Sequence, residues 1–192
     1  EQELRRRKAA AARRAKRAAA PAGTGAGADL SHASAVPTFA HLEAGLGGQA
    51  GLTTGRVGDP ESRPSGSLAG GSAWSTIKLA IAAQVLSEAG GPTGLDRADD
   101  DLIRKALTAS DNAAAAALFE KLSAAHGGVE GAAAAVEQPL RAAGDRATAV
   151  STQGRGEFSP YGQTEWSLVD QHRFVSRLVA GCVPDSASAE HI

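Results

Sequence analysis

The chain has little cysteine, few aromatic residues and no long apolar run. Its one cysteine, Cys182, has no partner for an internal disulfide, and we expect it to be a small buried apolar side chain. No apolar run approaches the ~18–20 residues that span a bilayer, and no fixed sequence period indicates a solenoid. Aromatic residues make up 4% of the 192 residues, so the predicted core is rich in alanine and built from closely packed helices.

Metal-ligand patterns are also missing from the sequence. The five histidines show no spacing typical of a metal site, and none belongs to a pattern of cysteines or carboxylates. We therefore assign no role to any histidine, and the sequence predicts neither a bound metal nor a cofactor.

Charge is unevenly distributed along the chain. The first twenty residues carry eight Lys or Arg against two Glu, a balance of +6, which leaves −7 for the rest of a chain with net charge −1. We predict a basic helical extension over 1–20, a flexible linker over 21–36 and a folded domain over 37–192. The extension lacks an apolar face. It either lies near an anionic membrane surface or is a solvated segment without a dedicated partner, and no specific nucleic acid is expected.

The hydrophobic pattern within 37–192 favours a domain of helices and strands. Glycine and proline over 58–62 mark a turn between two predicted strands, 51–57 and 65–69. Predicted helices cover 38–46, 74–89, 99–108, 112–126, 129–142 and 165–179. This order predicts an α+β fold, in which a helical domain accompanies a partial antiparallel sheet.

The most informative motif is Ser75-Thr76-Ile77-Lys78, where a glycine-rich stretch ends and an apolar helix begins. Ser75 is expected near a helix N-terminus, with Lys78 on the same face, so that its ammonium can fold back towards the Ser75 hydroxyl. A serine hydroxyl needs a neighbouring base to act as a nucleophile. Lys78 can be that base only where burial and a nearby cation favour its neutral amine. The alternative is structural: Ser75 caps the helix and Lys78 is solvated.

A second motif, Ser110-Asp111-Asn112, lies inside an alanine-rich helical stretch. Ser, Asp and Asn are all favoured N-cap residues, so the structural alternative is that Ser110 or Asp111 caps the helix running over 113–122. No other lysine in the chain has a serine three residues before it. The occurrence of both motifs in this order therefore favours an active site.

In these motifs the chain resembles the penicillin-recognising serine hydrolases, which include class A β-lactamases and D-alanyl-D-alanine peptidases. The likeness covers roughly Pro37 to Val183, and the stretches 73–78, 140–145 and 162–171 look like parts of actinobacterial β-lactamase-like proteins. The resemblance implies an α+β fold of the β-lactamase/transpeptidase type. It also implies a β-lactam or a peptidoglycan peptide as the substrate.

The resemblance assigns a role to each polar residue of the two motifs. Ser75 would be the acylated nucleophile and Lys78 its proton partner, while Ser110 would pass a proton to the leaving amine. Asn112 would donate a hydrogen bond to the substrate amide. Asp111 would be structural.

Two features of the family are missing here. The last lysine is Lys121, so no Lys-Thr-Gly strand, which in the family binds the substrate carboxylate and supplies an oxyanion-hole amide, follows the second motif. The domain is thus expected to be incomplete at its C-terminal side: the chain is a fragment, another chain supplies these parts, or the site is inactive. The region 146–164 also has no Glu-x-x-Leu-Asn run; Glu157 is interpreted as an exposed loop carboxylate and Glu165 as a first-turn helix residue.

Two functions therefore remain open, and fast β-lactam hydrolysis is not predicted. The first is a serine hydrolase that forms an acyl-enzyme on Ser75 and releases it slowly. The second is a catalytically silent penicillin-binding-like module that recognises a cell-wall peptide or a protein partner. The resemblance implies an extracytoplasmic location, although no signal peptide is visible and the basic run over 1–20 would favour the cytoplasmic side if a membrane segment preceded it.

Overall fold

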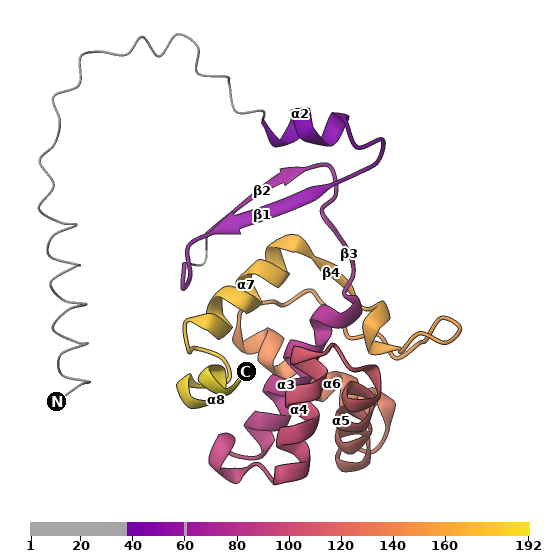
Figure 1. Ribbon diagram of the computed structural model, residues 1–192, viewed down its shortest axis with the longest axis vertical. Helices are drawn as coiled ribbons and strands as arrows, with labels where there is room; N and C mark the ends of the chain where they lie inside the picture. The colour runs from indigo at the N-terminus through magenta and orange to yellow at the C-terminus, as the bar shows by residue number, and fades with distance from the viewer. Residues whose placement is uncertain (1–37, 60) are drawn as a thin grey trace, which may run out of the picture. The chain divides into compact units, whose positions relative to one another are not determined.

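The computed structural model describes residues 38–59 and 61–192 (Figure 1). The predictions of a basic helical extension over 1–20 and of a linker over 21–36 lie outside the described residues. Residues 37–192 form one unit through their internal contacts. Within the described ranges, no helix has both the length and the apolar character that a bilayer crossing requires.

The described residues form helices and two small antiparallel sheets, so the fold class is α+β. The α-helices are α2 (Phe39–Ala44), α3 (Lys78–Glu88), α4 (Arg97–Thr108), α5 (Asn112–Ala125), α6 (Val129–Ala142), α7 (Leu168–Val179) and α8 (Ser186–His191). Short 3₁₀ helices are η2 (Trp74–Ile77), η3 (Pro92–Gly94) and η4 (Tyr161–Gln163). The strands are β1 (Gly51–Gly55), β2 (Ser62–Gly66), β3 (Gly70–Ser72) and β4 (Glu165–Ser167).

Helix α3 lies at the centre of the core. Its apolar side chains are buried on nearly all sides, and α4, α5, α6 and α8 all pack against it. Four of its residues are small or medium-sized and fully buried, which lets the neighbouring helices approach closely: Ala80, Ile81, Ala82 and Ala83. Leu86 is also fully buried, and burial of one such side chain contributes roughly 1.5–3 kcal/mol.

The two sheets differ in the sequence separation of the strands that they pair. Strands β1 and β2 form a hairpin in which Gly51 faces Gly66 and Gly55 faces Ser62, so the second strand begins three residues before the predicted 65–69. Strand β3 pairs with β4, which is far away in the sequence, and Ser72 faces Glu165. This second sheet was not predicted.

Glu165 was therefore placed wrongly in the first turn of a helix. It lies in β4, and the Ser72 hydroxyl donates to its carboxylate at 3.1 Å. The N-cap of α7 is Ser167, whose backbone is extended and whose Oγ accepts the Asp170 N–H at 3.0 Å. An N-cap of this kind sets the first helical residue, so α7 begins at Leu168 and leaves 165–167 free to pair as a strand.

Cys182 was also placed wrongly. It is exposed, because it lies just beyond the end of α7, where its backbone N–H bonds to Arg177 O at 2.9 Å. The side chain that enters the core at this turn is the next one, Val183, which is fully buried.

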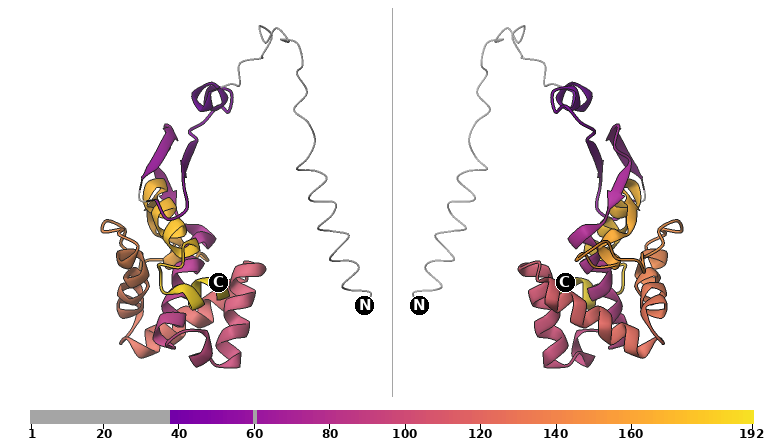
Figure 2. Two further views of the ribbon diagram at one scale, coloured as in Figure 1. Left: turned by 90° about the vertical axis from the view of Figure 1, so that its left-hand side faces the viewer. Right: turned by 90° about the vertical axis from the view of Figure 1, so that its right-hand side faces the viewer.

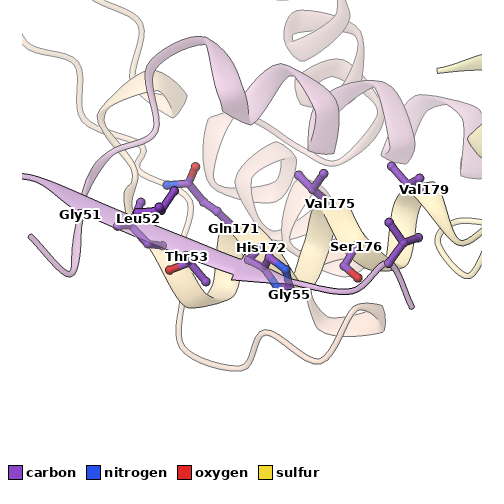
Figure 3. Close-up of a pocket in the computed structure, with 11 residues that line it drawn as sticks. Gly51, Leu52, Thr53, Gly55, Gln171, His172, Val175, Ser176 and Val179 are labelled. Carbon is purple, nitrogen blue, oxygen red and sulfur yellow. The ribbon is translucent and has the colours of Figure 1, made fainter. Parts of the chain in front are cut away.

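Helix α7 packs against the β1–β2 hairpin, at the opposite end of the domain from α4 and α5 (Figures 1 and 2). Glycines in β1 permit this close approach: a Cβ at Gly51 would lie 2.6 Å from Leu168 Cδ1, and one at Gly55 would lie 2.5 Å from His172 Cε1. Between the strand and the helix runs a groove of about 410 Å³ (Figure 3). Its walls are mainly apolar and include Leu52, Val57, Leu168, Val175 and Val179.

Candidate active site

Ser75 lies in the 3₁₀ turn η2, between strand β3 and helix α3. Neither η2 nor α3 has a side-chain cap, and the residues at their N-cap positions are Ala73 and Ile77. The structural alternative in which Ser75 caps the helix is therefore wrong. The turn is held by its neighbours, since Ala73 N–H donates to Thr164 O at 2.8 Å. Ser75 itself is exposed.

Lys78 is buried, with 3% of its surface exposed. Its ammonium donates to Ser110 O at 2.6 Å, to Ser110 Oγ at 3.2 Å and to Asn112 Oδ1 at 2.8 Å. An ammonium has three protons to donate, so these contacts use all of them. The alternative of a solvated lysine is wrong, because the amine lies in the connection between α4 and α5.

Ser110 joins the two motifs. Its hydroxyl lies 2.9 Å from Ser75 Oγ, so a chain of hydrogen bonds runs from Lys78 through Ser110 to Ser75. Within the described residues no direct hydrogen bond joins Lys78 to Ser75. The one-turn spacing predicted that Lys78 folds back towards the Ser75 hydroxyl. Instead its ammonium donates to three acceptors that all belong to the second motif.

Asp111 caps helix α5, as one of the structural alternatives predicted. Its carboxylate accepts the backbone N–H groups of Ala113 at 2.8 Å and Ala114 at 3.0 Å. Asn112 is the first residue of α5. Since its Oδ1 accepts from Lys78, its side-chain N–H₂ group remains available, and no described residue accepts from it.

The backbone beside the site is strained. Among the described residues, the non-glycine residues with positive φ are Trp74 at 47° and Ser110 at 51°. One precedes Ser75 and the other is its hydrogen-bond partner. Such a conformation costs about 1–3 kcal/mol per residue and is concentrated at functional sites.

Burial lowers the pKa of Lys78, and the negative charge of Asp111 opposes this shift. Sequence alone required a nearby cation to favour the neutral amine of Lys78. The charged group that acts on Lys78 is instead the Asp111 carboxylate, which favours the ammonium form. Hydrogen bonds from Ala114 and Ala113 together with the charges of Lys105 and Lys78 hold the pKa of Asp111 below its usual value, against the opposing effect of burial. Desolvation alone thus favours the neutral Lys78 amine.

A cavity of about 320 Å³ opens beside Ser75. Trp74 and Phe158 form an aromatic wall, with ring centroids 5.2 Å apart at 88°, and the Arg155 guanidinium lies 5.8 Å from each ring centroid. The cavity is also lined by Lys78, Asn112, Ala116, Glu157, Ser159, Tyr161, Gly162 and Gln163. Three of the four predicted site residues therefore line one cavity, and the fourth, Ser110, contacts two of them.

Most of the far wall was not predicted as part of the site. It comes from the loop that includes Arg155 and Phe158 and from η4, and no motif in the sequence marks either. Glu157 is exposed, as expected, but it lines the same cavity as Ser75. The sequence pointed to Glu157 only because it lies in the region 146–164, which corresponds to the loop that carries a catalytic glutamate in the class A β-lactamases that the sequence resembles.

A buried carboxylate supports the segment that leads to this wall. Asp145 is fully buried and accepts the N–H groups of Ala147 and Thr148 at 3.0 Å and the Trp166 indole N–H at 3.1 Å. Burial acts to raise the pKa of Asp145, but these hydrogen bonds outweigh it and the pKa is lowered. Arg141 donates to Asp145 O at 2.9 Å and so ties the segment to α6.

The described residues contain no group of three or more His, Cys, Asp or Glu side chains placed to hold a metal ion. The polar groups gathered beside Ser75 are a hydroxyl, an amine and an amide, from Ser110, Lys78 and Asn112. In the comparisons with known proteins, no protein-family model, no curated protein and no solved structure matches this chain.

Proposed function

We propose that this domain is a serine hydrolase of the penicillin-recognising type, with a β-lactamase-like fold, and that it forms an acyl-enzyme on Ser75. The observation that carries the proposal is the continuous hydrogen-bonded set of Lys78, Ser110 and Ser75 beside an open cavity. Ser75 and Ser110 are both exposed, so the hydrogen bond between their hydroxyls is expected to contribute little to stability. The proposed substrates are β-lactams or peptidoglycan peptides, acted on outside the cytoplasmic membrane.

Acylation begins with proton transfer along this set. Hydroxyl hydrogens rotate, so each serine can donate or accept. With Lys78 as the neutral amine, Ser75 gives its proton to Ser110 Oγ while Ser110 gives its own to Lys78 Nζ. Ser75 Oγ then forms a bond to the substrate carbonyl carbon. When the carbon–nitrogen bond breaks, the leaving nitrogen takes a proton from Ser110, which Lys78 replaces.

Two groups are placed to bind the substrate during this step. The backbone N–H of Ser75 lies in the first turn of η2, where helix N–H groups have no acceptor within the helix. It can therefore donate to the developing oxyanion. The free N–H₂ of Asn112 can donate to the carbonyl of the substrate amide, because only its oxygen is engaged by Lys78.

Deacylation is proposed to be slow. Within the described residues no carboxylate is hydrogen-bonded to Ser75, Ser110 or Lys78. Glu157 lines the cavity but is exposed, and no hydrogen bond among the described residues orients its carboxylate towards Ser75. An acyl-enzyme on Ser75 would therefore persist.

A second candidate function is a silent module that binds a cell-wall peptide or a protein partner. One observation favours it: Asp111 stabilises the ammonium form of Lys78, and that form cannot accept a proton. The two candidates share the cavity and differ in whether Ser75 becomes acylated.

Covalent labelling separates the two candidates. The protein is incubated with a fluorescent penicillin or a fluorophosphonate, and the adduct is measured by intact mass. The proposal predicts one adduct on the wild type and on Ser87→Ala, which changes an exposed serine of α3, and none on Ser75→Ala. Wild-type protein without an adduct at any probe concentration would contradict the hydrolase and support the module.

A further inference from the structure

The aromatic wall of the cavity beside Ser75 is exposed to solvent. Trp74 has 47% of its surface exposed and Phe158 has 43%, and both side chains line that cavity. The chain contains only two Trp, one Tyr and four Phe, and among the described residues no other aromatic side chain is exposed to this degree. The exposed aromatic surface of the described residues is therefore gathered at one cavity.

The second tryptophan gives the comparison within this chain. Trp166 is 1% exposed, its ring centroid lies 5.7 Å from that of Phe174, and its indole N–H donates to Asp145 at 3.1 Å. Burial of a large apolar side chain stabilises the folded state. Trp166 has this stabilisation and Trp74 forgoes much of it, so packing in the core does not explain the position of Trp74.

The backbone of Trp74 is a second unfavourable feature. Its φ is 47°, and a positive φ is a genuine outlier for a bulky residue. Strained residues of this kind are concentrated at active sites and ligand-binding sites. Trp74 directly precedes Ser75, so the strained backbone holds an exposed indole next to the proposed nucleophile.

The charges beside the aromatic wall are balanced. The Arg155 guanidinium lies 5.8 Å from the centroids of both rings, and the Glu157 side chain lines the same cavity. The segment 155–158 therefore carries one cation and one anion and has no net charge. A guanidinium also attracts the face of an aromatic ring, so Arg155 can contact such a ring in a ligand as it contacts Trp74 and Phe158. This wall thus favours an uncharged aromatic group.

We propose that Trp74 and Phe158 form a specificity subsite that binds an aromatic ring in the acyl part of the substrate. The inference rests on the proposed function, because this acyl part is the one that Ser75 takes up. A bound ring would pack edge-to-face or offset against the two rings, as aromatic pairs prefer, and would cover apolar surface that is now in water. The cavity volume of about 320 Å³ lies within the ~300–1,000 Å³ of small-molecule sites. The substrate class is then an arylacetyl amide or ester.

The kinetic test uses three activated esters that differ in the acyl group. These are the p-nitrophenyl esters of phenylacetic, cyclohexylacetic and acetic acid, and the acylation rate constant is measured for each with wild type and Trp74→Leu. Leucine keeps an apolar side chain at this position and removes the aromatic ring. The rate with the phenylacetate ester should fall roughly two- to tenfold, and the other two rates should change by less than about twofold. An equal loss with all three esters would mean that Trp74 only supports the turn that carries Ser75, and would overturn the inference.

Two further variants locate the preference on the molecule. Phe158→Leu removes the other ring of the aromatic wall and should reduce the phenylacetate rate selectively, as Trp74→Leu does. Leu52→Ala is the matched control, because Leu52 is 45% exposed and lines the groove between β1 and α7. It should leave all three rates within about twofold of wild type. If Leu52→Ala lowers the phenylacetate rate as Phe158→Leu does, the preference does not come from the aromatic wall and the inference is wrong.

A binding measurement keeps this inference separate from the proposed function. The chain has two tryptophans, so ¹⁵N-labelled Ser75→Ala protein gives two indole N–H signals in NMR spectra, which Trp74→Leu assigns. Neutral N-methylphenylacetamide is titrated into the protein. The Trp74 signal should shift, while the signal of Trp166, which is buried and bonded to Asp145, should stay in place. The saturated analogue, N-methylcyclohexylacetamide, should shift the Trp74 signal less at the same concentration.

The outcomes of these measurements separate the two proposals. A selective shift of Trp74, with no acylation of the wild type by any ester, would contradict only the hydrolase. Acylation of the wild type without this shift, or with equal shifts from the saturated analogue, would contradict the aromatic subsite. A larger shift with the anionic N-methylsuccinamate would mean that Arg155 selects a carboxylate, and would also overturn the inference.

Discussion

The two ends of this domain differ in how completely they bury their apolar surface. At one end, α3 is surrounded by helices and its side chains are buried. At the other, the β1–β2 hairpin and α7 enclose an open groove, and Val179 is 65% exposed. Lys78 is the first residue of α3 and Asn112 is the first residue of α5, and both helices belong to the buried end. The lysine proposed for proton transfer is therefore held by the well-packed part of the domain.

The position of Lys78 depends on the helical end of the domain and not on the two small sheets. The lysine amine is fixed by three acceptors and is covered by the core, whereas the far wall of the cavity depends on a loop and on η4. The two sides of the cavity should therefore respond differently to substitution. The following variants test that difference, beginning with the largest expected effect.

Replacement of Lys78 should have the largest effect on chemistry. Lys78→Met keeps a long side chain in the core but removes the amine, and loss of general acid–base catalysis costs roughly 10²–10⁴-fold in rate. The labelling rate with a fluorescent penicillin measures it. Three acceptors on Ser110 and Asn112 also lose their donor, so unfolding in urea should show a loss of about 1–3 kcal/mol. A labelling rate within tenfold of wild type would exclude Lys78 as the proton acceptor.

Removal of a buried side chain should lower the free energy of unfolding more at the buried end than at the open end. Leu86→Ala removes a fully buried side chain of α3, and such a substitution costs about 2–5 kcal/mol. Val179→Ala is the matched change at the open end and should cost less than about 0.5 kcal/mol, because its side chain is mostly exposed. The free energy of unfolding in urea measures both. Similar losses for the two variants would show that the groove is covered in solution.

Close approach of backbone in the hairpin gives a smaller, local effect. A Cβ at Gly51 would lie 1.9 Å from Leu68 O, while one at Gly48 would meet no atom within 4 Å. Gly51→Ala should therefore lose about 1–3 kcal/mol of stability, and Gly48→Ala should lose almost none. Labelling of Ser75 should proceed within about twofold of wild type in both, because the hairpin does not line the cavity. A large loss of labelling in Gly51→Ala would mean that the two ends of the domain are coupled.

Sequence reasoning predicted the helical end well because its signals are local. Helix α5 was predicted over 112–126 and is found at Asn112–Ala125, since alanine favours helix and Asp111 is a strong N-cap. The β3–β4 sheet was missed for the opposite reason. Its strands have three residues each, β3 contains two glycines, and Ser72 pairs with Glu165 across 93 positions, so no local pattern marks it.

The candidate site was predictable in its residues but not in its geometry. The approach of Ser75, Lys78 and Ser110 was expected from the resemblance, which supplied the pairing of two segments 35 positions apart. The positive φ of Trp74 and Ser110 and the turn of Lys78 towards the second motif depend on tertiary contacts.

Substitution of Asp111 should have the smallest effect, and it tests how the buried end sets the proton balance of Lys78. The Asp111 charge raises the pKa of Lys78 against the lowering effect of burial. In Asp111→Asn that charge is removed while the N-cap is kept, because asparagine caps a helix about as well as aspartate. The pKa of Lys78 should therefore fall further.

The sign of the resulting pH effect follows from the role of the neutral amine. Acylation should increase with pH as Lys78 loses its proton, and the midpoint of this increase should lie below the ordinary range of a lysine. In Asp111→Asn the midpoint should move to still lower pH, with stability changed by less than about 0.5 kcal/mol. The pH profile of the labelling rate measures it, with Asp101→Asn as a control on the exposed face of α4. A midpoint that does not move, or that moves to higher pH, would contradict an effect of the Asp111 charge on the pKa of Lys78. Burial alone would then set the protonation state of the lysine.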